Sequence, residues 1–200
     1  MRTTTRYGSP AQRFGAVHDR LAQRVQARAG LSVGFNNALV ECYSNAYATM
    51  GSHSDQALDL AEESFIAVFS CYRYPAAVPP RKLLFEQKGS GEMFEVPLVH
   101  NGVVVFSVAS NRRLRHKIVL DGAARAVENE WLGVTLRSSK TFVRFRGGHA
   151  YLPQGARLVL ADEDQRREFY RLRRRENDET DFVYPSLAYT VSESDLMVPV

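Results

Sequence analysis

Short apolar segments separated by turn signals fill the middle of the sequence, and this pattern most constrains the fold. Leu83-Leu84-Phe85 and Phe94-Glu95-Val96 flank Gly89-Ser90-Gly91, which is the pattern of a β-hairpin. Asn101-Gly102 is the strongest turn signal in the chain, and an apolar run at 103–106 follows it directly. Short strands at this spacing favour a sandwich or barrel over a parallel sheet.

Apolar runs on both sides of this region extend the same pattern. We expect further strands at residues 37–43, 65–69, 114–119, 132–136 and 141–145, and a single helical turn at 59–63. Together the segments predict a mainly β, α+β fold. Its core is a double-stranded β-helix, or jelly roll, at about residues 35–147, with helices packed on one face.

Two helices are expected to support this core. The segment 10–29 carries apolar side chains at three- and four-residue spacing (Phe14, Val17, Leu21, Val25), and Gly30 provides a stop. A second helix begins after the capping residue Asp162 and runs to about Arg175. Acidic residues interrupt its many arginines, which indicates a solvated amphipathic helix; the alternative is a basic patch for phosphates.

Composition limits the class of protein. Hydrophobic content of 44% over 200 residues fits one globular domain, residues 1–200, in which the second helix and an extended tail occupy 148–200. Residues 1–30 lack the apolar stretch of a signal peptide and no run has transmembrane length, so we expect a soluble, cytoplasmic protein. Cys42 and Cys71 lie in apolar runs without metal-ligand spacing and are expected to be buried free thiols.

A His-x-Asp pair, His53 and Asp55, is the candidate metal site. Alternate residues of an extended segment point the same way, so both side chains can reach one ion. His116 could supply the third ligand of a two-histidine, one-carboxylate set, which suits Fe(II) and leaves positions open for oxygen and substrate. The other histidines have no paired carboxylate and are expected to be structural or solvent-facing: His18, His100 and His149.

The run from Phe35 to Tyr43, followed ten residues later by His53-Ser54-Asp55, resembles the AlkB-type Fe(II)- and 2-oxoglutarate-dependent dioxygenases. That family shows an Asn-x-Tyr strand, a glycine just before the iron ligands, which Gly51 matches, and then His-x-Asp. Pro97-Leu98 with the Asn-Gly turn resembles the approach to the distal histidine. Gly133-Val134-Thr135-Leu136-Arg137 resembles the final strand, whose Thr-aromatic-Arg ending binds the cosubstrate. The resemblance covers about residues 35–145.

The resemblance implies Fe(II), 2-oxoglutarate and O2 as cofactors and cosubstrates. Arg137 is the implied partner of a 2-oxoglutarate carboxylate, because a guanidinium makes two parallel hydrogen bonds to such a group. Tyr43 would add a hydroxyl donor to the same anion. The implied reaction hydroxylates a C–H bond; if that carbon is attached to nitrogen, the product collapses and the alkyl group leaves as an aldehyde.

Three positions depart from the family pattern. Glu41 stands where the asparagine two residues before the tyrosine is expected, and Trp131 stands where a second arginine is expected. Lys140 and Arg125 are the candidates to replace that arginine. Ala57 stands where repair members carry an acid that contacts the damaged base, which weakens a DNA-repair interpretation.

Two classes of function therefore remain open. The first is an AlkB-like oxygenase acting on a modified nucleobase or nucleic acid, or, by the same chemistry, on a small molecule or amino acid. The second is a non-catalytic jelly-roll binding protein with a vestigial metal site. The intact triad favours the enzyme. The sequence predicts no membrane partner, and it identifies neither the substrate-binding residues nor the oligomeric state.

Overall fold

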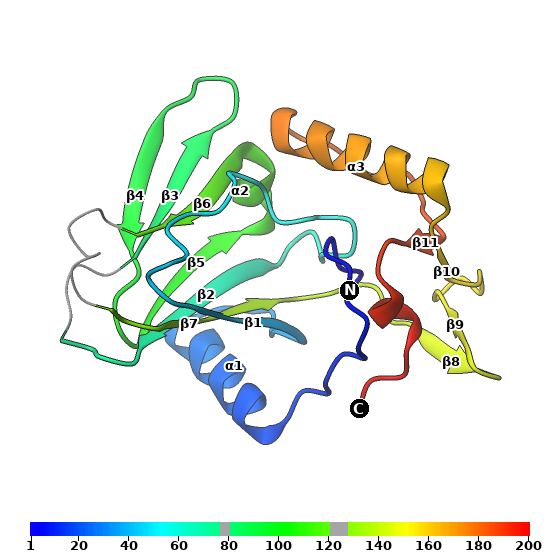
Figure 1. Cartoon of the computed structure of the whole chain (residues 1–200), viewed down its shortest axis with the longest axis horizontal. Helices are drawn as coiled ribbons and strands as arrows, with labels where there is room; N and C mark the ends of the chain where they lie inside the picture. The colour runs from blue at the N-terminus through cyan, green and yellow to red at the C-terminus, as the bar shows by residue number, and fades with distance from the viewer. Residues whose placement is uncertain (77–80, 121–127) are drawn as a thin grey trace.

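Two facing antiparallel sheets form the core of the chain, whose computed structural model describes residues 1–76, 81–120 and 128–200 (Figure 1). The major sheet has the strand order β1 (Asn37–Tyr43), β7 (Trp131–Arg137), β2 (Phe65–Tyr72) and β5 (Gly102–Ser107). The minor sheet has the order β4 (Met93–Pro97), β3 (Lys82–Gln87) and β6 (Leu114–Val119). Bridges at Thr49 and His53 add the segment 49–53 alongside β6.

The chain path through these sheets is that of a jelly roll. β1 lies in the major sheet, the segment 49–53 in the minor sheet, and β2 returns to the major sheet. The β3–β4 hairpin and β6 belong to the minor sheet, whereas β5 and β7 belong to the major sheet. This alternation between two antiparallel sheets confirms the predicted fold class. The predicted turns are also present, since Gly89, Gly91 and Asn101 all have positive φ.

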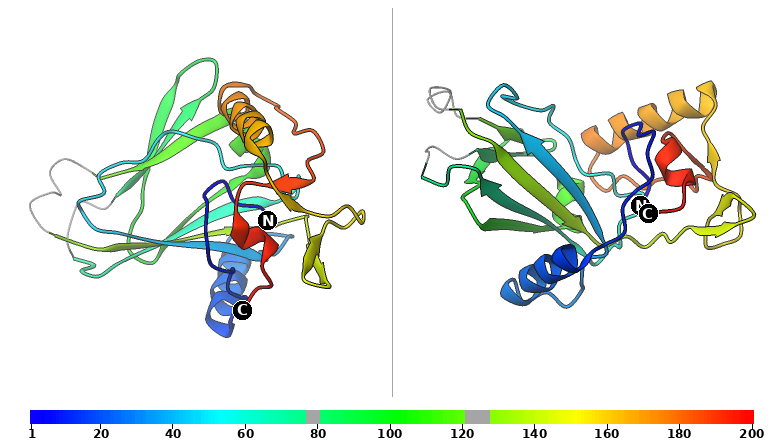
Figure 2. Two further views of the ribbon diagram at one scale, coloured as in Figure 1. Left: turned by 45° about the vertical axis from the view of Figure 1, so that its right-hand side comes forward. Right: turned by 60° about the horizontal axis from the view of Figure 1, so that its bottom comes forward.

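Apolar side chains fill the space between the sheets and the space behind the major sheet. Between the sheets lie six buried residues: Val68, Leu83, Phe85, Leu98, Ile118 and Trp131. Helix α1 (Ala16–Arg28) lies behind the major sheet (Figure 2). Its residues Ala22 and Val25 pack against Val134 and Leu136 of β7. Alternate residues of β7 therefore face opposite layers, as the period of a strand requires.

The helices do not share one face, contrary to the sequence prediction. Figures 1 and 2 place α1 against the outer face of the major sheet, whereas α3 (Glu163–Asp178) lies on the side of the short helix α2 (Val108–Arg113). The sequence did not predict α2, which begins after Ser107, whose Oγ accepts a hydrogen bond from the Ser110 amide. α3 begins as predicted, because Asp162 accepts from the Gln165 amide at 2.8 Å.

Three predicted segments were too long or wrong. α1 begins at Ala16 rather than at residue 10, because Gly15 is its N-cap. Residues 59–63 form turns and no helix. The strand expected at 141–145 is reduced to β8 (Arg144–Arg146), which pairs with β9 (His149–Tyr151). The Thr141 hydroxyl instead donates to Asp59 at 2.8 Å, which ties this stretch to the neighbouring loop.

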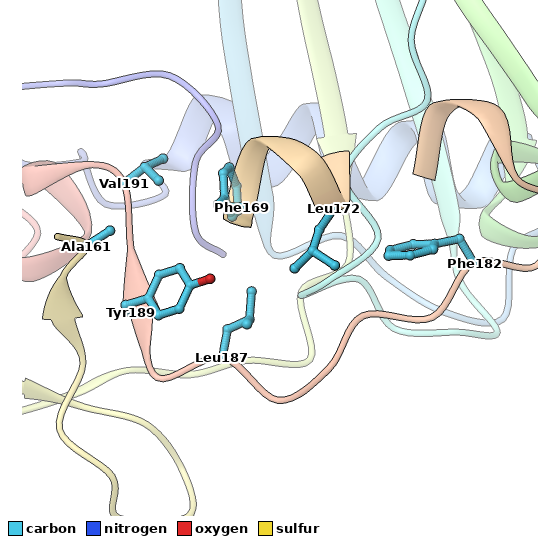
Figure 3. Close-up of a cluster of buried hydrophobic side chains, with 7 residues drawn as sticks. All are labelled: Ala161, Phe169, Leu172, Phe182, Leu187, Tyr189 and Val191. Atoms are coloured by element: carbon cyan, nitrogen blue, oxygen red, sulfur yellow. The ribbon is translucent and has the colours of Figure 1, made fainter. Parts of the chain in front are cut away.

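The C-terminal tail packs a small core of its own against α3. Strand β10 (Val159–Leu160) pairs in parallel with β11 (Tyr189–Thr190), and the 3-10 helix η2 (Glu193–Leu196) follows. Figure 3 shows the buried cluster that joins the tail to α3: Ala161, Phe169, Leu172, Phe182, Leu187, Tyr189 and Val191. The tail therefore fixes the position of α3.

The cysteines are free thiols, as predicted, but they are not buried. Cys42 is exposed and Cys71 is half-buried. Cys42 lies on the outer face of β1, and α1 covers only the Ala38 end of that strand, so Val40 on the same face is also exposed. No helix in the described ranges is both long and apolar enough to cross a membrane.

Candidate metal centre

Backbone pairing places the two candidate histidine ligands side by side. His53 and His116 are direct antiparallel partners: the His53 amide donates to the His116 carbonyl at 2.9 Å, and the His116 amide donates back at 2.7 Å. Asp55 lies two residues further on the same extended segment. The candidate ligand atoms of the three residues lie within 4.8 Å of one another. The structure thus brings together the three residues that the sequence singled out.

The distances within this cluster fit a shared ion. Oδ1 of Asp55 lies 3.9 Å from Nε2 of His53 and 3.8 Å from Nε2 of His116. Both separations are too long for a hydrogen bond. An ion that bonds each atom at about 2 Å spans separations of this size. The Nδ1 atom of His53 lies 2.8 Å from the Gly51 carbonyl oxygen, which orients the ring as in established metal sites.

Arg137 holds the other oxygen of the aspartate. Its Nε donates to Oδ2 of Asp55 at 2.8 Å, and both side chains are buried. Burial alone would raise the pKa of Asp55, but Arg137 and the two histidines hold it well below its usual range. Asp55 is therefore a carboxylate at neutral pH. Its Oδ1 remains directed at the imidazoles, as a monodentate ligand requires.

His116 lies in an apolar environment that keeps it neutral. Burial lowers the pKa of the His116 imidazole to about 4. Phe106 and Phe85 surround it, with ring centroids 5.4 Å and 5.9 Å from that of His116. A neutral imidazole is the form that binds metal. The side chain of His53 is 33% exposed, so the cluster is more accessible to solvent at His53 than at the buried His116 and Asp55.

Asn111 of α2 fixes the backbone of the aspartate. Its Oδ1 accepts from the Asp55 amide at 2.8 Å and its Nδ2 donates to the Asp55 carbonyl at 2.7 Å. The side chain is fully buried. A bidentate contact of this kind prevents rotation of the ligand backbone. No local sequence pattern points to Asn111, because the contact joins segments 56 residues apart.

The last turn of α3 holds the backbone on both sides of Asp55. Asn177 accepts from the Ser54 amide at 2.9 Å, and Glu176 accepts from the Ala57 amide at 2.7 Å. Arg173 donates to the Ser54 carbonyl at 3.0 Å. The helix that the sequence predicted as a solvated surface element thus contributes buried contacts to the ligand segment.

The structure does not bring Tyr43 close to Arg137. Arg137 pairs with Asn37 at one end of β1, whereas Tyr43 pairs with Trp131 at the other end. The Tyr43 hydroxyl already donates to Glu41, and its ring stacks on Trp131 with centroids 5.5 Å apart. A direct role for Tyr43 in binding the cosubstrate stays a prediction.

The expected replacements for the missing arginine have different outcomes. Lys140 is exposed and lies 3.8 Å from Glu62, while Arg125 falls outside the described residues.

Arg81 is a buried cation that the sequence patterns did not point to. Its guanidinium lies 5.7 Å from the ring centroid of Tyr43 and donates to backbone carbonyls of the loop at residues 44–47.

Neither the models of known protein families nor the curated protein sequences contain a match to this chain. Among solved structures, the chain is similar to a prolyl-4-hydroxylase from Pseudomonas putida, with 21% identity and a TM-score of 0.39. The similarity covers 62% of this chain and 62% of that chain. The chain therefore spans less than two thirds of its neighbour, and the similarity at this level assigns no activity to it.

Proposed function

We propose that this protein is an Fe(II)- and 2-oxoglutarate-dependent oxygenase that hydroxylates a C–H bond of its substrate. The observation that carries the proposal is the convergence of His53, Asp55 and His116 inside a jelly roll. Two neutral imidazoles and one carboxylate are the ligand set of non-haem Fe(II) oxygenases. When bound, Fe(II) supplies oxygen activation coupled to the decarboxylation of 2-oxoglutarate to succinate and CO2.

The side chains of the site have separate tasks in this proposal. His53, Asp55 and His116 would hold the ion and leave coordination positions open for cosubstrate and oxygen. Arg137 keeps Asp55 monodentate through Nε, and its two terminal nitrogens have no partner among the described residues. Those nitrogens can donate to a carboxylate beside the metal. Phe85 and Phe106 give His116 apolar surroundings, which would limit the access of water to a metal bound there.

The finer proposal is AlkB-like oxidative demethylation of a modified nucleobase or nucleic acid. It rests on the resemblance of residues 35–145, with Tyr43 and Arg137 as the cosubstrate residues. Hydroxylation of an amino acid or another small molecule requires the same metal chemistry. A screen of methylated nucleosides, oligonucleotides and amino acids, read out as aldehyde or hydroxylated product, distinguishes these substrates.

The reaction class is tested by succinate formation. Purified protein with Fe(II), 2-oxoglutarate and O2 should release succinate above the background of the metal and cosubstrate alone. His116→Ala should abolish this release, whereas His149→Ala, at an exposed histidine bonded to Arg157, should retain it. Equal succinate from wild type and His116→Ala would contradict the enzyme and favour a non-catalytic jelly-roll binding protein.

A further inference from the structure

A row of four paired residues, three of them small, crosses the inner face of the major sheet, away from the metal cluster. Glu41 of β1 pairs with Gly133 of β7, Gly133 pairs with Ser70 of β2, and Ser70 pairs with Gly102 of β5. These residues face the interior. Gly133 lies four residues before the inward-facing Arg137, and residues an even number apart along a strand share a face. Two glycines and a serine leave the sheet surface shallow at this level.

The indole of Trp131 lies over this row. A Cβ atom added to Gly133 would meet the Cη2 atom of Trp131 at 2.0 Å, so the ring leans along β7 toward the metal end. Trp131 is 1% exposed and belongs to the cluster between the sheets. Glycine is therefore required at position 133 to admit the ring. The indole ring thereby fills space between the two sheets, at the position where the AlkB-type pattern has an arginine.

Two buried hydrogen-bond donors at this level have no partner among the residues that the structure describes. The Oγ atom of Ser70 and the Nε1 atom of Trp131 are inaccessible to solvent and unpaired. Leaving a buried donor unpaired costs free energy, and most such groups in folded proteins are satisfied. Two unpaired donors on neighbouring strands, facing the same interior, indicate an acceptor that the described part of the chain does not provide.

The position of these donors relates them to the metal centre. Gly133 lies four residues before Arg137 along β7, roughly 13 Å at the rise of a strand, and Ser70 pairs with Gly133 on the neighbouring strand β2. Arg137 contacts Asp55 at the metal end of this distance, and the Trp131 indole lies over Gly133 at the other end. The row of paired sheet residues between them carries one polar side chain, that of Thr135, whose hydroxyl has no hydrogen-bond partner among the described residues.

We propose that Ser70 and Trp131 bind the distal carboxylate of 2-oxoglutarate, with the serine hydroxyl and the indole N–H as donors. This assignment rests on the proposed function and names the far end of the same site. Trp131 then takes the place of the expected arginine as a neutral donor. Buried positive charge comes from Arg81, close to Tyr43, and offsets the neighbouring Glu41.

Trp131 also provides the measurement, because it is the only tryptophan in the chain. Under anaerobic conditions with Mn(II) as a redox-inert substitute for Fe(II), 2-oxoglutarate should change the tryptophan fluorescence saturably. The comparison ligand is 2-oxopentanoate, which has a methyl group in place of the distal carboxylate. Wild type should prefer 2-oxoglutarate by roughly tenfold or more, as expected for hydrogen bonds to a charged group.

Ser70→Ala should remove most of this preference while Mn(II) affinity, measured separately by electron paramagnetic resonance, stays unchanged. The ligand-free variant should remain as stable as wild type, because the substitution removes an unpaired buried hydroxyl. Ser64→Ala is the matched control: this buried serine lies beside the same strand and its hydroxyl already donates to Ala61. Trp131→Phe, studied by calorimetry, should lose the preference as well.

The outcomes separate the two proposals. If Mn(II) binds but wild type does not distinguish the two 2-oxo acids, or Ser70→Ala keeps the full preference, the assignment of Ser70 and Trp131 is wrong and a water satisfies the donors. If Mn(II) does not bind, or binds while neither 2-oxo acid does, the proposed function fails and the assignment fails with it.

Discussion

Arg137 and Asp55 form a buried pair in which the guanidinium Nε donates to the carboxylate Oδ2 at 2.8 Å. The pair joins the last residue of β7 to the segment that carries the candidate metal ligands. One arginine thereby orients the aspartate and presents its remaining nitrogens to the space beside the metal. Metal binding and cosubstrate binding should therefore depend on the same side chain.

Arg137→Ala should weaken both Mn(II) and 2-oxoglutarate binding and lower the free energy of unfolding. Removing one partner of a buried ion pair leaves an uncompensated charge and costs on the order of 3–5 kcal/mol. Arg137→Lys should recover only part, because an ammonium cannot reproduce the planar fork. Urea unfolding and metal titration measure these effects, with Arg144→Ala, at an exposed strand arginine, as control. Unchanged metal affinity in Arg137→Ala would contradict the orienting role.

Asn111→Ala should lower metal affinity by roughly 10–100-fold, the range typical of groups that orient a ligand. Asn129 provides a matched control, because its side chain makes the same two-bond contact with the backbone of Tyr74, at 3.0 Å and 3.1 Å. Both alanine variants should lose stability, but only Asn111→Ala should lose metal affinity in a Co(II) titration. An equal effect of the two variants on Co(II) binding would assign Asn111 a structural role alone.

Glu176→Ala should also weaken metal binding, since Glu176 accepts from the Ala57 amide and from the Tyr184 hydroxyl at 2.6 Å. Its loss frees the backbone beside Asp55 and leaves buried donors unpaired. Glu168 lies on the same helix and accepts from the Tyr189 hydroxyl at 3.1 Å. Glu168→Ala therefore removes a contact between α3 and the C-terminal tail and leaves the Glu176 contact with the segment beside Asp55 in place. Metal affinity lowered to the same degree in both variants would contradict a specific contribution from Glu176.

The metal-free protein should lose stability as the pH falls from about 6.5 to about 4. The pKa of His116 is lowered from 6.5 to about 4 by burial, so in this window the unfolded chain binds a proton that the folded chain does not. The contribution of neutral His116 to the free energy of unfolding is complete above pH 6.5 and is lost as the pH approaches 4. Urea unfolding with chelator present measures it. His116→Gln should flatten the dependence, and an unchanged slope in that variant would assign the titration to another group.

Local sequence patterns were sufficient for most of the strands and for the candidate ligands. The Gly-Ser-Gly and Asn-Gly turns set the hairpin and the start of β5 through positive φ values, which glycine and asparagine adopt more readily than other residues. The His-x-Asp spacing places two side chains on one face of an extended segment, because alternate residues of such a segment point the same way. These features do not require knowledge of distant contacts.

The remaining features depend on packing that the sequence pattern does not encode. Asn111 and Glu176 act on the ligand segment through contacts 56 and 119 residues away in sequence. The exposure of Cys42 follows from how far α1 extends over β1. Trp131 was identified only as a departure from the family pattern, and its position over Gly133 follows from the three-dimensional structure.

The most direct test of the account is an anaerobic titration of the protein with Fe(II) and 2-oxoglutarate, followed by visible absorption. A 2-oxo acid chelated to Fe(II) gives a charge-transfer band that neither component shows alone. We expect wild type to develop this band to saturation at one Fe(II) per chain and His116→Ala not to develop it. A wild-type protein that binds Fe(II) but gives no band with 2-oxoglutarate would contradict the proposed 2-oxoglutarate-dependent oxygenase.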